Sequence, residues 1–97
     1  MSVDTEMVDV IFRVDREGEV FALMPGIAGT LDPATCTSYQ HVGQHSSADL
    51  AFCLRRSRAA TAEEAGPLLR ELQQIGYVVN VIHNATRSHY RQRVKQL

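Results

Sequence analysis

Residues 8–14 place apolar side chains at every second position: Val8, Val10, Phe12 and Val14. A period of two is typical of a β-strand with one buried face, because successive side chains of a strand point to opposite sides. Gly18 tolerates the positive φ of a tight turn, and residues 19–24 read as a returning strand. The sequence therefore predicts a β-hairpin at the start of the fold, which excludes an all-helical chain.

The chain after the hairpin alternates between turn-forming and strand-forming stretches. Prolines and glycines between Pro25 and Pro33 predict a loop of about ten residues, because proline cannot donate to a sheet ladder. Residues 36–42 are rich in β-branched and aromatic side chains, so they predict a third strand that ends at Gly43. Residues 46–56 fit either a strand or a short helix, and their alternating apolar residues favour the strand.

The main helix is predicted over residues 62–75. Thr61 and Glu64 have the spacing of a capping box, in which each side chain accepts a hydrogen bond from the other residue's backbone amide. Gly76 is suited to the left-handed cap at the other end. Pro67 lacks an amide hydrogen, so we expect a distorted first turn or a helix that begins at Pro67 itself. The apolar stripe of this helix consists of Ala65, Leu68, Leu69, Leu72 and Ile75.

Two further elements are predicted after the helix. Residues 77–83 are almost continuously apolar, which is typical of a strand in the centre of a sheet. Residues 84–97 are basic, with Tyr90, Val94 and Leu97 at helical spacing, and predict a short helix or a frayed tail. The expected fold class is α+β, with a small antiparallel-rich sheet packed on one main helix. The 97 residues suffice for a single domain, with a core over residues 8–83 and a basic tail over residues 84–97.

Charge divides the chain into two halves. Residues 1–49 hold eight acidic and two basic residues, whereas residues 50–97 hold three acidic and eight basic ones. Such polarity lets the halves attract each other within the fold or across a homodimer, or it places a basic surface before nucleic acid. No apolar run is long enough for a membrane span and the first residues are acidic, so we expect a cytoplasmic protein without a membrane partner. Cys36 and Cys53 fit a reducing compartment as free thiols.

Residues 36–47 gather a thiol, two imidazoles, two amides and several hydroxyls. They contain the run Cys-x-Ser-Tyr-x-His-Val-Gly-Gln-His, which is preceded by Met-Pro and followed by Arg-x-Ala-Thr-x-x-Glu and Leu-x-x-Glu-Leu-x-x-Ile-Gly-Tyr. In these motifs the chain resembles a family of small uncharacterised bacterial proteins, some of them encoded on mobile elements. The resemblance covers about residues 8–83 and implies a domain of that extent. The family has no established activity, so the resemblance implies no catalytic or binding residues.

The cysteine and histidines of this segment suggest two kinds of chemistry. Cys36, His41 and His45 are residue types found in zinc sites, with Cys53 or His83 as a fourth ligand. A cysteine beside a histidine base is also the pairing of a nucleophilic thiol. Against both, Cys36 and His41 stand five positions apart and face opposite sides of a strand, and no nucleophile elbow accompanies them. We therefore expect no cofactor, no enzyme, and histidines that hydrogen-bond the loop backbone.

The sequence thus predicts a non-catalytic binding or regulatory domain with a protein partner. The recognition surface is expected over the loop and strand of residues 26–47, since loops with tyrosine and polar side chains are typical of interfaces. The candidate binding residues are Tyr39, His41, Gln44 and His45. Two alternatives stay open: metal binding by Cys36, His41 and His45, and nucleic-acid binding through the basic C-terminal half. The candidate nucleic-acid residues are Arg87, Arg91, Arg93 and Lys95.

Overall fold

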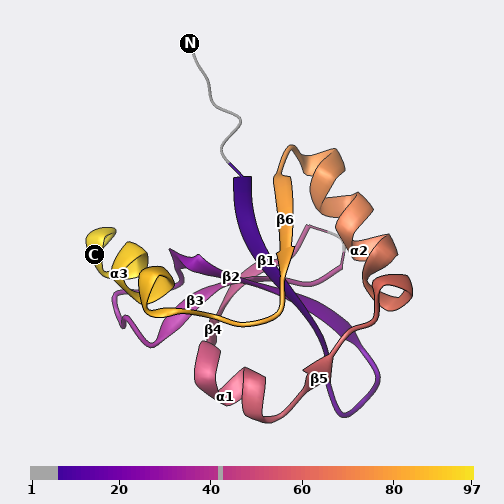
Figure 1. Cartoon of the computed structure of the whole chain (residues 1–97), viewed down its shortest axis with the longest axis horizontal. Coiled ribbons are helices and arrows are strands. Elements are labelled where there is room, and N and C mark those ends of the chain that lie inside the picture. Colours follow the sequence, from indigo (N-terminus) through magenta and orange to yellow (C-terminus); the bar gives the residue numbers. More distant parts are fainter. Residues whose placement is uncertain (1–6, 42) are drawn as a thin grey trace.

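The computed structural model describes residues 7–41 and 43–97, which form one six-stranded sheet and three helices (Figure 1). In chain order the elements are β1 (Met7–Val14), β2 (Val20–Ala28), β3 (Thr35–Tyr39), β4 (His45–Asp49), α1 (Leu50–Arg55), β5 (Arg58–Ala59), α2 (Ala62–Ile75), β6 (Val78–Ile82) and α3 (Arg87–Lys95). The predicted third strand ends earlier than expected, at Tyr39, and Val42 lies outside the described residues.

The strands lie in the order β4-β3-β2-β1, and β5 and β6 share the remaining edge of β1. Every neighbouring pair is antiparallel except β1 and β6, which run parallel and lie side by side in Figure 1. β1 and β2 form the predicted hairpin, and Gly18 in its turn has a φ of +86°. The α+β fold class with an antiparallel-rich sheet is therefore confirmed.

α2 covers one face of the sheet, and its predicted capping box at Thr61 and Glu64 is present. The helix begins at Ala62 and continues through Pro67, so of the two alternatives the one in which the helix begins at Pro67 is wrong. Its fully buried Leu72 lies at the centre of the core on this side. That core consists of Val10, Phe12, Ala22, Met24, Tyr39, Ala65, Leu68 and Leu72.

α1 packs on the opposite face, over a second cluster that includes Ile11, Leu23 and Cys36. The ambiguous stretch of residues 46–56 forms both structures in succession, since β4 ends at Asp49 and α1 starts at Leu50. Asp49 separates them because its side chain accepts a hydrogen bond of 2.9 Å from the amide of Phe52 and so caps the helix. The preference for a single strand here was therefore wrong for its second half.

The loop predicted between Pro25 and Pro33 is shorter than expected, because β2 continues through Pro25 and Gly26 to Ala28. The register between β2 and β3 shifts between Met24 and Ala28, and such an irregularity is where a strand tolerates proline. The carbonyl of Pro25 is also occupied, as it accepts a hydrogen bond of 2.8 Å from Arg93. Contacts from a helix distant in sequence thus complete a strand that local composition argues against.

β6 is an edge strand, so its predicted central position is wrong. It pairs with β1 only, and its Val78 and Val81 side chains remain 39% and 45% exposed. An apolar run indicates burial on both faces only where other elements cover both faces of the strand. Here the chain leaves the sheet after Ile82 and continues into α3.

α3 is the predicted basic helix, yet it belongs to the fold rather than to a free tail. Its buried residues are His89 and Arg93, each 5% exposed, whereas the expected apolar stripe of Tyr90, Val94 and Leu97 faces outward. His89 pairs with Asp9 of β1 at 2.8 Å, and the hydrogen bond from Asn80, followed by the one from His89, lowers the pKa of Asp9. α3 thus packs against the sheet through polar contacts. Within the described residues, none of the helices is both long and apolar enough to cross a membrane.

Candidate recognition site at the β3–β4 hairpin

Tyr39 is fully buried at the end of β3, and its hydroxyl connects the β3–β4 hairpin to α2. The hydroxyl donates to the carboxylate of Glu71 and accepts a hydrogen bond of 2.8 Å from the amide of Gly43. Burial, followed by the bond to Glu71, raises the pKa of Tyr39, so the phenol stays protonated and remains a donor. His41 Nδ1 lies 2.8 Å from the same carboxylate, although the His41 side chain is 81% exposed.

His45 lies on the same side of the hairpin, at the first position of β4. Its ring meets the ring of Tyr39 edge-on at 4.8 Å, and its Nε2 is 2.9 Å from the hydroxyl of Tyr77. Gln44 is exposed and contributes its backbone carbonyl, which accepts a bond of 3.0 Å from the amide of Gln40. The structure therefore brings Tyr39, His41 and His45 together, and Gln44 forms the exposed tip beside them.

Glu71 and Tyr77 complete this cluster, and the sequence did not single them out. Both lie about thirty positions away from the hairpin, so no local motif connects them to it. Glu71 is outside the predicted apolar stripe, although it follows Leu68 by three positions and borders that stripe. A carboxylate at the border of a buried stripe was the available signal.

Cys36 lies apart from these histidines, as it faces α1 on the opposite side of the sheet. Its side chain is fully buried, and burial raises the pKa of the thiol to about 11, which disfavours the thiolate that binds zinc or attacks carbon. Among the residues that the structure describes, no three histidine, cysteine or acidic side chains gather as metal ligands. The zinc site proposed for Cys36, His41 and His45 is therefore not formed.

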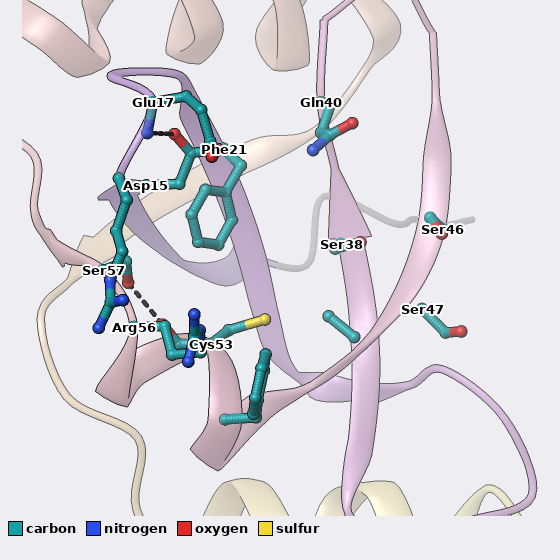
Figure 2. Close-up of a pocket in the computed structure, with 13 residues that line it drawn as sticks. Asp15, Glu17, Phe21, Ser38, Gln40, Ser46, Ser47, Cys53, Arg56 and Ser57 are labelled. Carbon is teal, nitrogen blue, oxygen red and sulfur yellow. Dashed lines mark hydrogen bonds between the residues drawn. The ribbon is translucent and has the colours of Figure 1, made fainter.

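A groove of about 360 Å³ lies on the α1 face of the same hairpin (Figure 2). Polar residues of β3, of β4 and of the position after β3 line one side of it, and one aromatic residue of β2 and one of α1 also belong to its lining. These residues are Ser38, Gln40, Ser46, Ser47, Phe21 and Phe52. Hydrogen-bonding groups beside apolar surface are typical of a ligand site, and the volume falls within the usual range for one.

Charged groups lie at the end of the groove near the β1–β2 turn. Asp15 and Glu17 come from the turn, and Arg56 follows the last residue of α1. The Arg56 guanidinium stands 5.1 Å from the centre of the Phe52 ring, a distance at which cation–π attraction holds the two side chains together. The groove therefore offers polar side chains on one side and, near the β1–β2 turn, charged groups of both signs that include the fixed cation of Arg56.

The candidate nucleic-acid residues are divided by the structure. Arg87, Arg91 and Lys95 are exposed on α3, but Arg93 donates to the carbonyls of Pro25 and Pro33 and is buried. Arg93 therefore belongs to the interior contacts of the fold, and its place in that candidate set was wrong. Comparisons with protein-family models, curated proteins and solved structures find no match for this chain.

Proposed function

We propose that this protein is a non-catalytic binding domain that recognises an extended segment of another polypeptide at the open edge of β4 and in the adjoining groove. The carrying observation is the combination of an exposed edge strand with a groove that its own side chains line. Peptides commonly bind such edges as an additional strand, with main-chain hydrogen bonds for affinity and side-chain pockets for specificity.

The backbone groups available on β4 follow from the ladder it forms with β3. The amide of Gln40 donates to the carbonyl of Gln44, and the amide of Leu50 donates to the carbonyl of Ala34. Hydrogen-bonded pairs alternate along an antiparallel ladder, so Ser46 and Ala48 point their backbone groups toward β3. The amides and carbonyls of Ser47 and Asp49 then point away from β3, toward the open edge.

The polar side chains of β4 make this edge selective for particular peptide segments rather than prone to aggregation. His45, Ser46, Ser47 and Asp49 are exposed, and none of them is apolar. An apolar open edge invites aggregation, whereas a polar one pairs only with a segment that also satisfies the neighbouring groups. Ser38 and Ser46 lie opposite each other on the groove side and provide such groups.

The cluster around Glu71 supports binding by fixing the hairpin before the ligand arrives. Glu71 of α2 accepts a hydrogen bond from Tyr39 at the end of β3 and contacts His41 in the turn that follows. A hairpin that is already ordered loses little conformational entropy on binding, so more of the interaction energy appears as affinity. This assigns Tyr39, His41 and His45 to positioning the edge, while Gln44 remains an exposed contact.

The test is a peptide selection followed by two substitutions at one position. Random peptides displayed on phage are selected on the full chain, and binding is then measured for Ser47→Pro and Ser47→Ala. Ser47→Pro removes the hydroxyl and also an outward amide hydrogen, without removing a bond to β3, whereas Ser47→Ala removes only the hydroxyl, so the difference between the two variants measures the amide. We expect Ser47→Pro to weaken the selected peptides about tenfold or more, which corresponds to one lost main-chain bond. Circular dichroism verifies that both variants are folded.

Equal binding to Ser47→Pro and to the parent chain would contradict strand addition. So would amide chemical-shift changes that cluster on α2 or α3 and spare residues 45–49. Equal losses of binding in Ser47→Ala and Ser47→Pro would show that the hydroxyl, not the main chain, is recognised, because both variants lack the hydroxyl.

A homodimer is a second candidate because β6 presents an apolar open edge. Val78 and Val81 are exposed there, and a two-fold axis near Asn80 would pair β6 with the same strand of a second copy. Light scattering of the full chain should then give twice the monomer mass, and the Val81→Lys variant should give the mass of a single monomer. A monomer at high micromolar concentration would remove this candidate.

A further inference from the structure

A second hollow of about 350 Å³ lies beside the groove, between the β1–β2 turn, the end of α1 and β5. We call it the arginine hollow, because Arg16, Arg55, Arg56 and Arg58 line it together with a single carboxylate, that of Asp15. Arg55, Arg56 and Arg58 come from one short run at and after the end of α1, and the fold adds Arg16 from about forty positions earlier in the chain.

The charges in the arginine hollow are not balanced by its neighbours. Arg58 is paired with Glu64 through two bonds of 2.9 and 2.7 Å. The Oδ1 atom of Asp15 accepts the amides of two residues of the turn, both at 2.9 Å. Arg16, Arg55 and Arg56 take part in none of the ion pairs among the described residues. These three arginines therefore line the hollow without an ion pair in the described part of the chain, and Asp15 supplies the one carboxylate there.

The carbonyl groups at the end of α1 would normally repel an anion, but they are already occupied. Arg13 donates to the carbonyls of Leu54 and Ser57, and the Ser57 hydroxyl donates to the carbonyl of Cys53 at 2.6 Å. The amide of Arg56 bonds the carbonyls at the end of the same helix. The negative end of α1 is thus covered by donors, which leaves the surrounding guanidinium groups to set the local potential.

We propose that the arginine hollow binds a phosphate group carried by the polypeptide that occupies the groove. Guanidinium groups match phosphate oxygens in planar, two-pronged hydrogen bonds, and several of them around one hollow suit a dianion. The hollow and the groove share Asp15, Arg16, Arg56 and Ser57, so one extended ligand reaches both. Phosphate binding stands by itself, whereas the polypeptide source rests on the proposed function.

The first experiment uses inorganic phosphate as the probe, titrated into the full chain at constant ionic strength. We expect saturable chemical-shift changes in the Nε–Hε signals of Arg16, Arg55 and Arg56. The dissociation constant should lie in the millimolar range, which corresponds to a binding free energy of about 4 kcal/mol. Arg55→Gln should weaken binding about tenfold, the equivalent of one lost charged hydrogen bond. Arg91→Gln is the matched control, because Arg91 is an exposed arginine of α3 outside the hollow.

Shifts that never saturate, or equal losses in Arg55→Gln and Arg91→Gln, would show unspecific attraction and overturn the site. The second experiment compares one groove-binding peptide with its phosphoserine form. Preference for the phosphorylated form, lost in Arg55→Gln, supports the proposal. Peptide binding without that preference overturns the phosphate site and leaves the proposed function standing.

The remaining outcomes distinguish the source of the phosphate. Phosphate binding that persists in Ser47→Pro, together with no peptide binding to any variant, refutes the proposed function and the polypeptide source but not the anion site. Adenosine monophosphate that binds tighter than the phosphopeptide would reassign the hollow and groove to a nucleotide. Competition between inorganic phosphate and the phosphopeptide would support occupancy of one shared site.

Discussion

Arg93 provides the sharpest test of how α3 is attached. The residue is 5% exposed, and its guanidinium donates to the carbonyls of Pro25 at 2.8 Å and Pro33 at 3.0 Å. A hydrogen bond from a charged donor contributes roughly 1.5–3 kcal/mol, so the two together amount to about 3–6 kcal/mol. Relief of the guanidinium's desolvation returns part of this when the side chain is removed. We therefore predict that Arg93→Ala lowers the free energy of unfolding by about 2–4 kcal/mol.

The assay is urea denaturation followed by circular dichroism, with hydrogen exchange of the α3 amides as a local readout. Arg91→Ala is the matched control, because Arg91 is exposed on the same helix and its loss should change stability by less than about 0.5 kcal/mol. Arg93→Lys should fall between the two, since an ammonium group keeps the charge but lacks the planar fork. If Arg93→Ala and Arg91→Ala unfold at the same urea concentration, Arg93 does not hold α3 to the sheet.

Three further predictions concern the two faces of the sheet and the cap of α2. Leu72→Ala should cost about 2–5 kcal/mol in urea denaturation because Leu72 is fully buried, and a loss below about 1 kcal/mol would show that the core is misassigned. Iodoacetamide at neutral pH should label Cys53 before Cys36 in the folded protein, as read by mass spectrometry, since burial raises the Cys36 pKa to about 11. The hydrogen bond from Arg58 lowers the pKa of Glu64 from 4.5 to about 2, so its stabilisation is complete above pH 4.5 and is lost as pH falls toward 2. The stability difference between the parent chain and Glu64→Gln should shrink over that interval, and a constant difference would contradict the ion pair.

Local patterns predicted the parts of the fold whose determinants are close in sequence. The alternation of residues 8–14 and the glycine of the following turn gave the hairpin, because register and turn are set within a few residues. Thr61 and Glu64 located the start of α2 for the same reason, since a capping box closes within one turn. Even Pro67 did not displace that start, because the cap and the packing of Leu72 outweigh one missing amide.

The errors fall where contacts distant in sequence decide the structure. β2 extends past Pro25 because Arg93 binds the proline's carbonyl from a helix at the other end of the chain. α3 buries His89 and Arg93 instead of its apolar residues. The reason is that His89 bonds the carboxylate of Asp9, and Arg93 donates to the carbonyls of Pro25 and Pro33. A hydrophobic pattern alone cannot reveal such an interface, because the partners of its polar residues are invisible in the local sequence.

The polar segment of residues 36–47 shows what the alternation of side chains along a strand can predict and what it cannot. Parity along a strand correctly separates Cys36 and Ser38 from Tyr39, since neighbouring side chains of β3 face opposite sides of the sheet. Parity does not tell which helix covers each face, so the anchor at Glu71 and the groove beside α1 both required the structure. One short hairpin therefore serves two purposes. Its α2 face fixes the edge of β4, and its α1 face offers hydroxyls beside a cationic hollow, so substitutions on the two faces should separate stability from binding.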